Sequence, residues 1–150
     1  MIFISHRGNI NGINKNEENK PEYILHALSN NFDVEIDIWY VNGSFALGHD
    51  HPSFFIDEKF LNNKKIWLHA KNIEALNQLN IRGLHCFWHQ NDDVVLTSKG
   101  FLWTYPGKQL TKNSICVLPE TLSTFTYDCA GLCSDFILKY YNEFNKSNNF

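Results

Sequence analysis

The sequence predicts an α/β fold built on a parallel sheet, and two observations support this prediction. Apolar, strand-like runs alternate with helical patterns along the chain, as they do in α/β proteins. Polar residues gather where these strands end, and functional side chains of parallel sheets collect at the carboxyl ends of strands. A regular (β/α)₈ barrel takes about 250 residues, whereas this chain has 150. We therefore expect a compact TIM-type barrel with several outer helices shortened or missing.

The expected elements follow from apolar runs, turn residues and helix-start signals. Strands are expected over residues 2–4, 33–40, 45–47, 66–71, 84–89, 94–97, 101–105, 115–118 and 131–134, and helices over 21–30, 73–80, 119–127 and 135–144. Residues 53–63 are expected to be irregular or one weak helix. The apolar content of 43% suits one core, so we predict a single domain over residues 1–141 and a C-terminal tail over residues 142–150.

The strand over residues 33–40 carries the clearest local pattern. Side chains alternate across a strand, so Glu35, Asp37 and Trp39 share one face. The opposite face is apolar and consists of Val34, Ile36, Ile38 and Tyr40. The strand over residues 66–71 repeats this division, with Trp67, His69 and Lys71 opposite Ile66, Leu68 and Ala70. The two acids are therefore expected on a face that water or a ligand reaches.

Two carboxylates at alternate strand positions lie roughly 7 Å apart. Glu35 and Asp37 are thus close enough to share a divalent cation, and they need a cation or a basic partner if they are buried. The alternative is a structural network in which the two acids pair with Arg7 and Lys71. The spacing leaves both interpretations open.

Histidines supply candidate proton-transfer groups. His6 ends the first strand and is followed by Arg7. An imidazole, which titrates near neutrality, therefore lies next to a guanidinium, which can bind two phosphate oxygens at once. An ordinary surface histidine is the alternative. His49 offers a second imidazole, next to Asp50 and His51, and this group is interpreted either as an acid–base pair or as metal ligands.

The remaining chemistry-bearing residues have structural alternatives. His69 and His89 are interpreted as metal ligands or core histidines, and we favour a pocket wall for His89. The four tryptophans are expected mainly in the core. The four cysteines are expected to be buried free thiols: Cys86, Cys116, Cys129 and Cys133.

Composition excludes several classes of partner. The net charge is −3 and the basic residues are scattered, which disfavours a nucleic-acid partner. No apolar run approaches the length of a membrane span, and the first apolar run is too short for a signal peptide. We therefore expect a cytoplasmic protein without a membrane span.

Several motifs occur in an order that resembles the glycerophosphodiester phosphodiesterase family, within the broader group that includes phosphatidylinositol-specific phospholipase C. The motifs are His6-Arg7-Gly8, Glu18-Asn19, Glu35-Ile36-Asp37, Gly48-His49-Asp50 and Lys71. The resemblance is dense over residues 4–72 and thinner afterwards, where residues 131–135 are similar to the family's last barrel strand. It implies a TIM barrel with a divalent cation, usually Mg²⁺ or Ca²⁺, at its mouth.

The resemblance also implies residue roles. Glu35 and Asp37 would bind the metal, with Glu18 nearby as a ligand or a supporting group. His6 and His49 would act as general base and general acid. The two basic residues would act on the phosphate, Arg7 by holding an oxygen and Lys71 by neutralising charge that develops on phosphorus.

His69 departs from the family pattern, which usually has a metal-binding Glu two residues before the Lys. Imidazole suits Mn²⁺ or Zn²⁺ better than Mg²⁺ or Ca²⁺, so the metal is expected to be one of these if His69 binds it. The resemblance implies a metal-dependent hydrolase of a small-molecule phosphodiester. Two alternatives remain open: a degenerate barrel that binds a phosphorylated ligand or partner without turnover, and a lyase that releases a cyclic phosphate.

Overall fold

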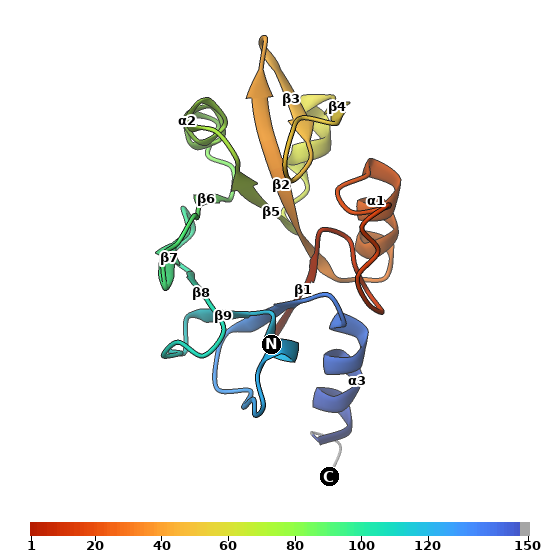
Figure 1. Ribbon diagram of the computed structural model, residues 1–150, viewed down its shortest axis with the longest axis vertical. Coiled ribbons are helices and arrows are strands. Elements are labelled where there is room, and N and C mark those ends of the chain that lie inside the picture. The colour runs from red at the N-terminus through yellow and green to blue at the C-terminus, as the bar shows by residue number, and fades with distance from the viewer. Residues whose placement is uncertain (148–150) are drawn as a thin grey trace.

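The computed structural model describes residues 1–147 and consists of one mixed sheet with helices packed on it (Figure 1). Within these residues the sheet has ten strands: β1 (Ile2–His6), β2 (Asp33–Val41), β3 (Ser44–Leu47), β4 (Phe54–Ile56), β5 (Ile66–Ala70), β6 (Cys86–Trp88), β7 (Val94–Leu96), β8 (Leu102–Thr104), β9 (Ser114–Val117) and β10 (Gly131–Ser134). The helices are α1 (Pro21–Ser29), α2 (Ile73–Ile81) and α3 (Ile137–Ser147), with short 3-10 helices η1 (Glu58–Asn62) and η2 (Pro119–Thr121).

Parallel pairing organises the sheet. Seven strands form a parallel series in the order β6, β5, β2, β1, β10, β9, β8. The last strand of this series, β8, pairs in parallel with β9. The end of β2 continues past β1 and pairs antiparallel with β3, which pairs with β4. The remaining strand, β7, pairs antiparallel with β8. The sheet curls as it passes through these pairs, and the β2 and β3 hairpin projects at the top of Figure 1.

The expected TIM-type barrel is wrong. The protein is a mostly-sheet, curled half-barrel of mixed strands, with only three short α-helices in residues 1–147 instead of a helix after each strand. No ladder joins β6 to β8 within the described part of the chain, so the curled sheet stays open there. The term TIM barrel therefore does not apply to this chain.

Short connections in the second half explain the missing helices. Residues 105–113 join β8 to β9 and contain Pro106 and Gly107, which favour turns, and the segment is too short for a helical crossover. The helix expected over residues 119–127 is also wrong, because only the 3-10 turn η2 forms there. Its remainder is rich in Thr, Ser and aromatic residues, which have lower helix propensity.

The other boundaries differ less. Residues 53–63 contain the short strand β4 followed by η1, so the expectation of irregular structure or one weak helix missed a strand. Residues 142–147, assigned from sequence to a tail, form the second half of α3. Residues 148–150 of that tail lie outside the described residues. No helix within residues 1–147 is long and apolar enough to cross a membrane.

Two hydrophobic clusters occupy opposite faces of the curled sheet. On the outer face, side chains of β2 and β5 pack under the helices; the strand residues are Val34, Ile36, Ile38, Ile66, Leu68 and Ala70. On the inner face, the parallel strands contribute a second cluster formed by Ile4, Trp67, Phe87, Trp103, Ile115, Val117 and Cys133. The alternation predicted for β2 and β5 is confirmed, since their apolar residues share one face. Trp67 and Trp103 are buried as expected, whereas Trp39 and Trp88 are half-buried.

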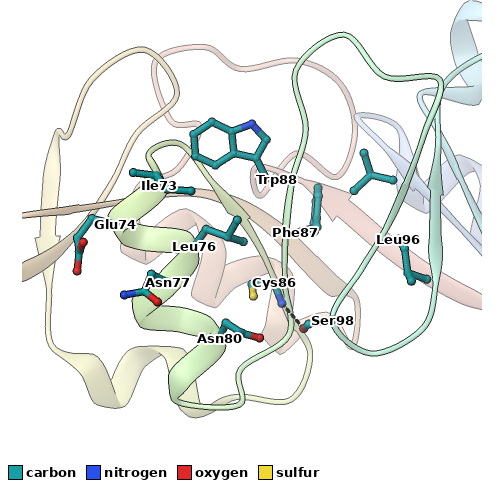
Figure 2. A pocket seen from close by; sticks show the side chains of 11 residues that line it. Ile73, Glu74, Leu76, Asn77, Asn80, Cys86, Phe87, Trp88, Leu96 and Ser98 are labelled. Atoms are coloured by element: carbon teal, nitrogen blue, oxygen red, sulfur yellow. Dashed lines mark hydrogen bonds between the residues drawn. The ribbon is translucent and has the colours of Figure 1, made fainter.

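The four cysteines are free thiols, of which Cys129 is half-buried and the other three are buried. Cys86 also lines an apolar groove of 710 Å³ between α2 and the strands β6 and β7 (Figure 2). Leu76 and Trp88 line its interior, and the only charged side chain among its lining residues is Glu74. This groove lacks the acids and histidines of the predicted site, which lie elsewhere.

Candidate active site

The predicted site residues come together where the parallel strands end. His6 is the last residue of β1, Lys71 follows β5, and Asp135 follows β10. The strand register places His6 beside Glu35 and Asp37 beside His69. Residues from distant parts of the chain therefore meet because the carboxyl ends of parallel strands share one edge of the sheet.

Asp37 is completely buried, and four side chains surround its carboxylate. Oδ1 lies 3.1 Å from His69 Nδ1 and 3.4 Å from Lys71 Nζ, while Oδ2 lies 2.9 Å from Arg7 Nε and accepts a 3.0 Å hydrogen bond from Asn19 Nδ2. Burial acts to raise the pKa of Asp37, but the His69 contact and the nearby cations outweigh it and hold the pKa well below its usual range. Asp37 is therefore ionised near neutral pH.

Glu35 is also buried, at 2% exposure, but it has fewer partners. Its Oε1 lies 3.5 Å from His69 Nδ1, and its Oε2 lies 3.9 Å from His6 Nε2. Within residues 1–147, Oε2 makes no hydrogen bond. A buried carboxylate oxygen without a hydrogen bond is costly, so this atom indicates a position where a cation fits.

His69 faces both acids with one ring nitrogen. Its Nε2 donates to the His89 backbone carbonyl at 3.2 Å, and its ring stacks on Phe87 at 5.1 Å with an interplanar angle of 8°. Nδ1 is therefore the atom that either carries a proton toward the acids or binds a metal. Burial acts to lower the pKa of His69, but the contacts with Asp37 and Glu35 raise it to about 9.

Glu35, Asp37 and His69 form a group that could hold a divalent metal. One ligand atom from each residue lies within 4.8 Å of the others. The unpaired Glu35 oxygen and the fixed orientation of His69 both suit a metal, because ligating histidines usually donate their other nitrogen to a carbonyl or carboxylate. A donor set of two carboxylates and one imidazole fits Mn²⁺ or Zn²⁺.

Arg7 and Lys71 pair with Asp37, so contacts of the structural network weighed from the sequence are also present. Glu18 is not in the three-residue group. It accepts hydrogen bonds from Arg7 Nη1 at 3.2 Å and from Asn9 Nδ2 at 2.9 Å. Glu18 therefore orients the guanidinium in this structure.

His6 forms a dyad with Asp135. His6 Nδ1 donates to Asp135 Oδ1 at 2.8 Å, and Asn9 Nδ2 donates to the same oxygen at 2.8 Å. Burial acts to lower the pKa of His6, while the bond to Asp135 and the charge of Glu35 raise it, and the net effect is an increase. The dyad leaves Nε2 of His6 directed toward the acid group.

His49 approaches the site from the loop after β3. Its Nδ1 donates to Asp50 Oδ1 at 2.7 Å, and both side chains are more exposed than the buried acids. Gly48 makes this loop possible, because it has a φ of +144° and a Cβ there would lie 2.2 Å from the His51 carbonyl oxygen. His51 itself is exposed.

These side chains open onto one cavity of 330 Å³, lined by His6, Arg7, Glu35, His49, His69, Lys71, His89, Gln90, Trp103, Tyr105, Val117 and Leu118. A second cavity of 440 Å³ shares Arg7 and His49 with it. Of the two acids expected on a face that a ligand reaches, Glu35 lines the first cavity and Asp37 does not. The acids themselves, however, lie almost fully below its surface.

Sequence reasoning missed several residues of this site. Asn9 joins Glu18 to Asp135, and the side-chain amide of Asn19 binds both the backbone N–H and the carboxylate of Asp37. Asn9 does not stand out in a chain rich in asparagine, and Asn19 is part of the Glu18-Asn19 motif but has no role predicted from the sequence. The run ending at Asp135 was noted for its resemblance, but its pairing with His6 depends on β10 lying beside β1.

Comparisons with known proteins identify no relative of this chain. No family model, curated protein or solved structure matches this chain. The resemblance to glycerophosphodiester phosphodiesterases therefore rests on the motif residues alone.

Proposed function

We propose that this protein is a metal-dependent phosphodiester hydrolase that acts on a glycerophosphodiester or a related alcohol-phosphate diester. One observation supports it above all others. Two of the three residues that could hold a metal, Glu35 and His69, line the same cavity as two further histidines and two basic side chains, and the third, Asp37, is buried in contact with His69. Phosphodiester cleavage needs these elements: positive charge on the phosphate oxygens, a base for the nucleophile and an acid for the leaving alkoxide.

The chain's own residues divide these tasks. Arg7, oriented by Asp37 and Glu18, binds a phosphate oxygen together with Lys71. His6, oriented by Asp135, is placed to accept a proton at Nε2. A divalent cation held by Glu35, Asp37 and His69 would supply further charge neutralisation at the phosphate when bound.

His49 is the candidate general acid. It lies on a loop at the edge of the cavity, and its ring is oriented by Asp50. Its greater exposure suits a group that exchanges protons with water between turnovers.

The experiment is a hydrolysis assay with bis(p-nitrophenyl) phosphate in Mg²⁺, Ca²⁺, Mn²⁺ or Zn²⁺ and in excess EDTA. We expect activity with at least one metal, loss in EDTA, and a loss of about 10³-fold or more in the double variant His6→Asn, His49→Asn. His26→Asn is the matched control, because His26 is exposed on α1 away from the site. Full activity in the double variant would contradict the proposal. With glyceryl p-nitrophenyl phosphate, which has a hydroxyl group that can displace p-nitrophenolate from phosphorus, phosphorus NMR of the products separates hydrolysis from release of a cyclic phosphate.

A second candidate is a protein that binds a phosphorylated ligand without turnover. The four contacts around Asp37 favour it, since the surrounding cations and polar groups already compensate the charge of this carboxylate without any metal. Calorimetry that detects inorganic phosphate binding, with no hydrolysis in any of the four metals, would select this candidate.

A further inference from the structure

His89 is a buried histidine whose ring nitrogens make no hydrogen bond within residues 1–147. It follows β6, its side chain is 3% exposed, and its Nδ1 lies 3.8 Å from Asp92 Oδ2, beyond hydrogen-bond length. Its ring centroid lies 4.0 Å from that of Tyr105. A phenylalanine could pack against Tyr105 without burying unpaired nitrogens, so a histidine here indicates a polar partner that enters the cavity.

The cavity that His89 lines has both basic and apolar lining residues. Arg7 and Lys71 are cationic, which suits a phosphate. Trp103, Val117 and Leu118 are apolar, which suits carbon atoms. A molecule with a phosphate at one end and a carbon skeleton beside it therefore matches this lining.

Size restricts that carbon skeleton. A cavity of 330 Å³ is at the lower end of the range for ligand pockets, about 300–1,000 Å³, and has room for a phosphate with a short alcohol arm. The other arm of a diester has separate room in the 440 Å³ cavity, which shares Arg7 and His49. A long apolar chain does not fit beside the phosphate in the first cavity.

The chemistry of the ring indicates the polar group on the short arm. A neutral imidazole has one donor and one acceptor, and a hydroxyl group can serve either nitrogen because it both donates and accepts. A cationic amine on this arm would meet the positive charges of Arg7 and Lys71. A hydroxyl is therefore the best partner.

We propose that His89 recognises a free hydroxyl group on a short alcohol arm, so that the protein prefers diesters of small polyols to the same diesters without hydroxyl groups. This inference rests on the proposed phosphodiesterase function. His89 determines specificity by hydrogen bonding, and no covalent bond forms or breaks at its ring.

The test compares two substrates with the same leaving group, glyceryl p-nitrophenyl phosphate and n-propyl p-nitrophenyl phosphate, in the same metal. We expect wild type to favour the glyceryl ester about 10-fold to 100-fold in kcat/KM. His89→Phe should bring this ratio close to one, and His89→Gln should restore part of it. His85→Phe is the control and should keep the wild-type ratio, because His85 donates to or accepts from Thr97 and lines a different cavity.

A wild-type ratio near one would overturn the inference and requires no variant to fold. An unchanged ratio in folded His89→Phe would overturn it as well. Calorimetry with glycerol 1-phosphate and n-propyl phosphate separates this inference from the proposed function. Suppose that no diester is hydrolysed, but that wild type binds glycerol 1-phosphate more tightly than n-propyl phosphate and His89→Phe does not. The proposed function is then wrong, and recognition of the hydroxyl group by His89 stands. If both diesters are hydrolysed equally well, the function stands and the recognition is wrong.

Discussion

The two faces of β2 show how one strand serves two purposes. On the outer face, Ile36 is completely buried among apolar side chains of the strands and helices. On the inner face, Asp37 is equally buried but is surrounded by charged and polar partners at specific distances. Apolar packing is non-directional and tolerates similar shapes, whereas a buried carboxylate needs each of its partners. Substitutions on the outer face should therefore reduce stability alone, whereas substitutions on the inner face should reduce both stability and activity.

The largest effect is expected from Asp37→Asn on the inner face. Removing the charge leaves Arg7 and Lys71 near a neutral amide in a buried setting, which should lower the free energy of unfolding by about 3–5 kcal/mol. The low pKa of Asp37 means that its contribution exists above about pH 4 and is lost as the pH falls further. Urea unfolding at pH 7, together with hydrolysis per folded molecule, measures both consequences. Wild-type activity in folded protein would show that Asp37 has no chemical role.

On the outer face, Ile36→Ala should lower the free energy of unfolding by about 2–5 kcal/mol, because it leaves a cavity under the helices. We expect the activity of the folded fraction to stay within about 3-fold of wild type. Urea unfolding and assays at low temperature make the comparison. A large loss of activity in folded Ile36→Ala would show that the two faces are not independent.

The pKa of His69 gives a stability effect of known sign. Its folded-state pKa of about 9 lies above the usual 6.5, so protonated His69 stabilises the metal-free protein fully below pH 6.5. This contribution is lost as the pH rises toward 9 and amounts to about 3 kcal/mol at ~1.4 kcal/mol per pKa unit. Urea unfolding in EDTA should show the loss in wild type and not in His69→Gln. Parallel profiles for the two proteins would mean that His69 is neutral in the folded state.

Two carboxylates that orient histidines provide a smaller, matched test. Asp135 holds His6 at 2.8 Å and is mostly buried, whereas Asp50 holds His49 at 2.7 Å and is exposed. Asp135→Asn should lower kcat/KM by about 10-fold to 100-fold, since the buried partner orients the base. Asp50→Asn should change it by less than about 5-fold, because exposed pairs contribute little. Equal effects would show that burial of the partner does not matter here.

The alternation of polar and apolar residues correctly predicted which side chains share a face within one strand. Alternation correctly separated Ile36 from Asp37 and Leu68 from His69, because the side-chain period of a strand is two residues whatever surrounds it. The convergence of His6 and Lys71 followed from parallel strands ending at one edge. These parts of the site depend only on local geometry and strand direction.

The fold class could not be obtained in the same way. The predicted compact barrel, with several outer helices shortened or missing, still needed its strands to close into a ring, whereas no ladder joins β6 to β8 within residues 1–147. Asn9 and Asp135 are 126 positions apart and meet only because β10 pairs with β1. The periodicity of the sequence does not predict such a contact, since the contact arises from the order in which the strands of the whole sheet pair.

The proposed function depends on a divalent metal bound jointly by Glu35, Asp37 and His69 at the phosphate site. A crystal grown with Mn²⁺ and inorganic phosphate, with diffraction data collected at the manganese absorption edge, shows whether this metal binds there. We expect one anomalous peak bonded to a side-chain atom of each of these three residues, with phosphate density between it and Arg7 or Lys71. An anomalous map without a peak at these residues would mean that they do not form a metal site.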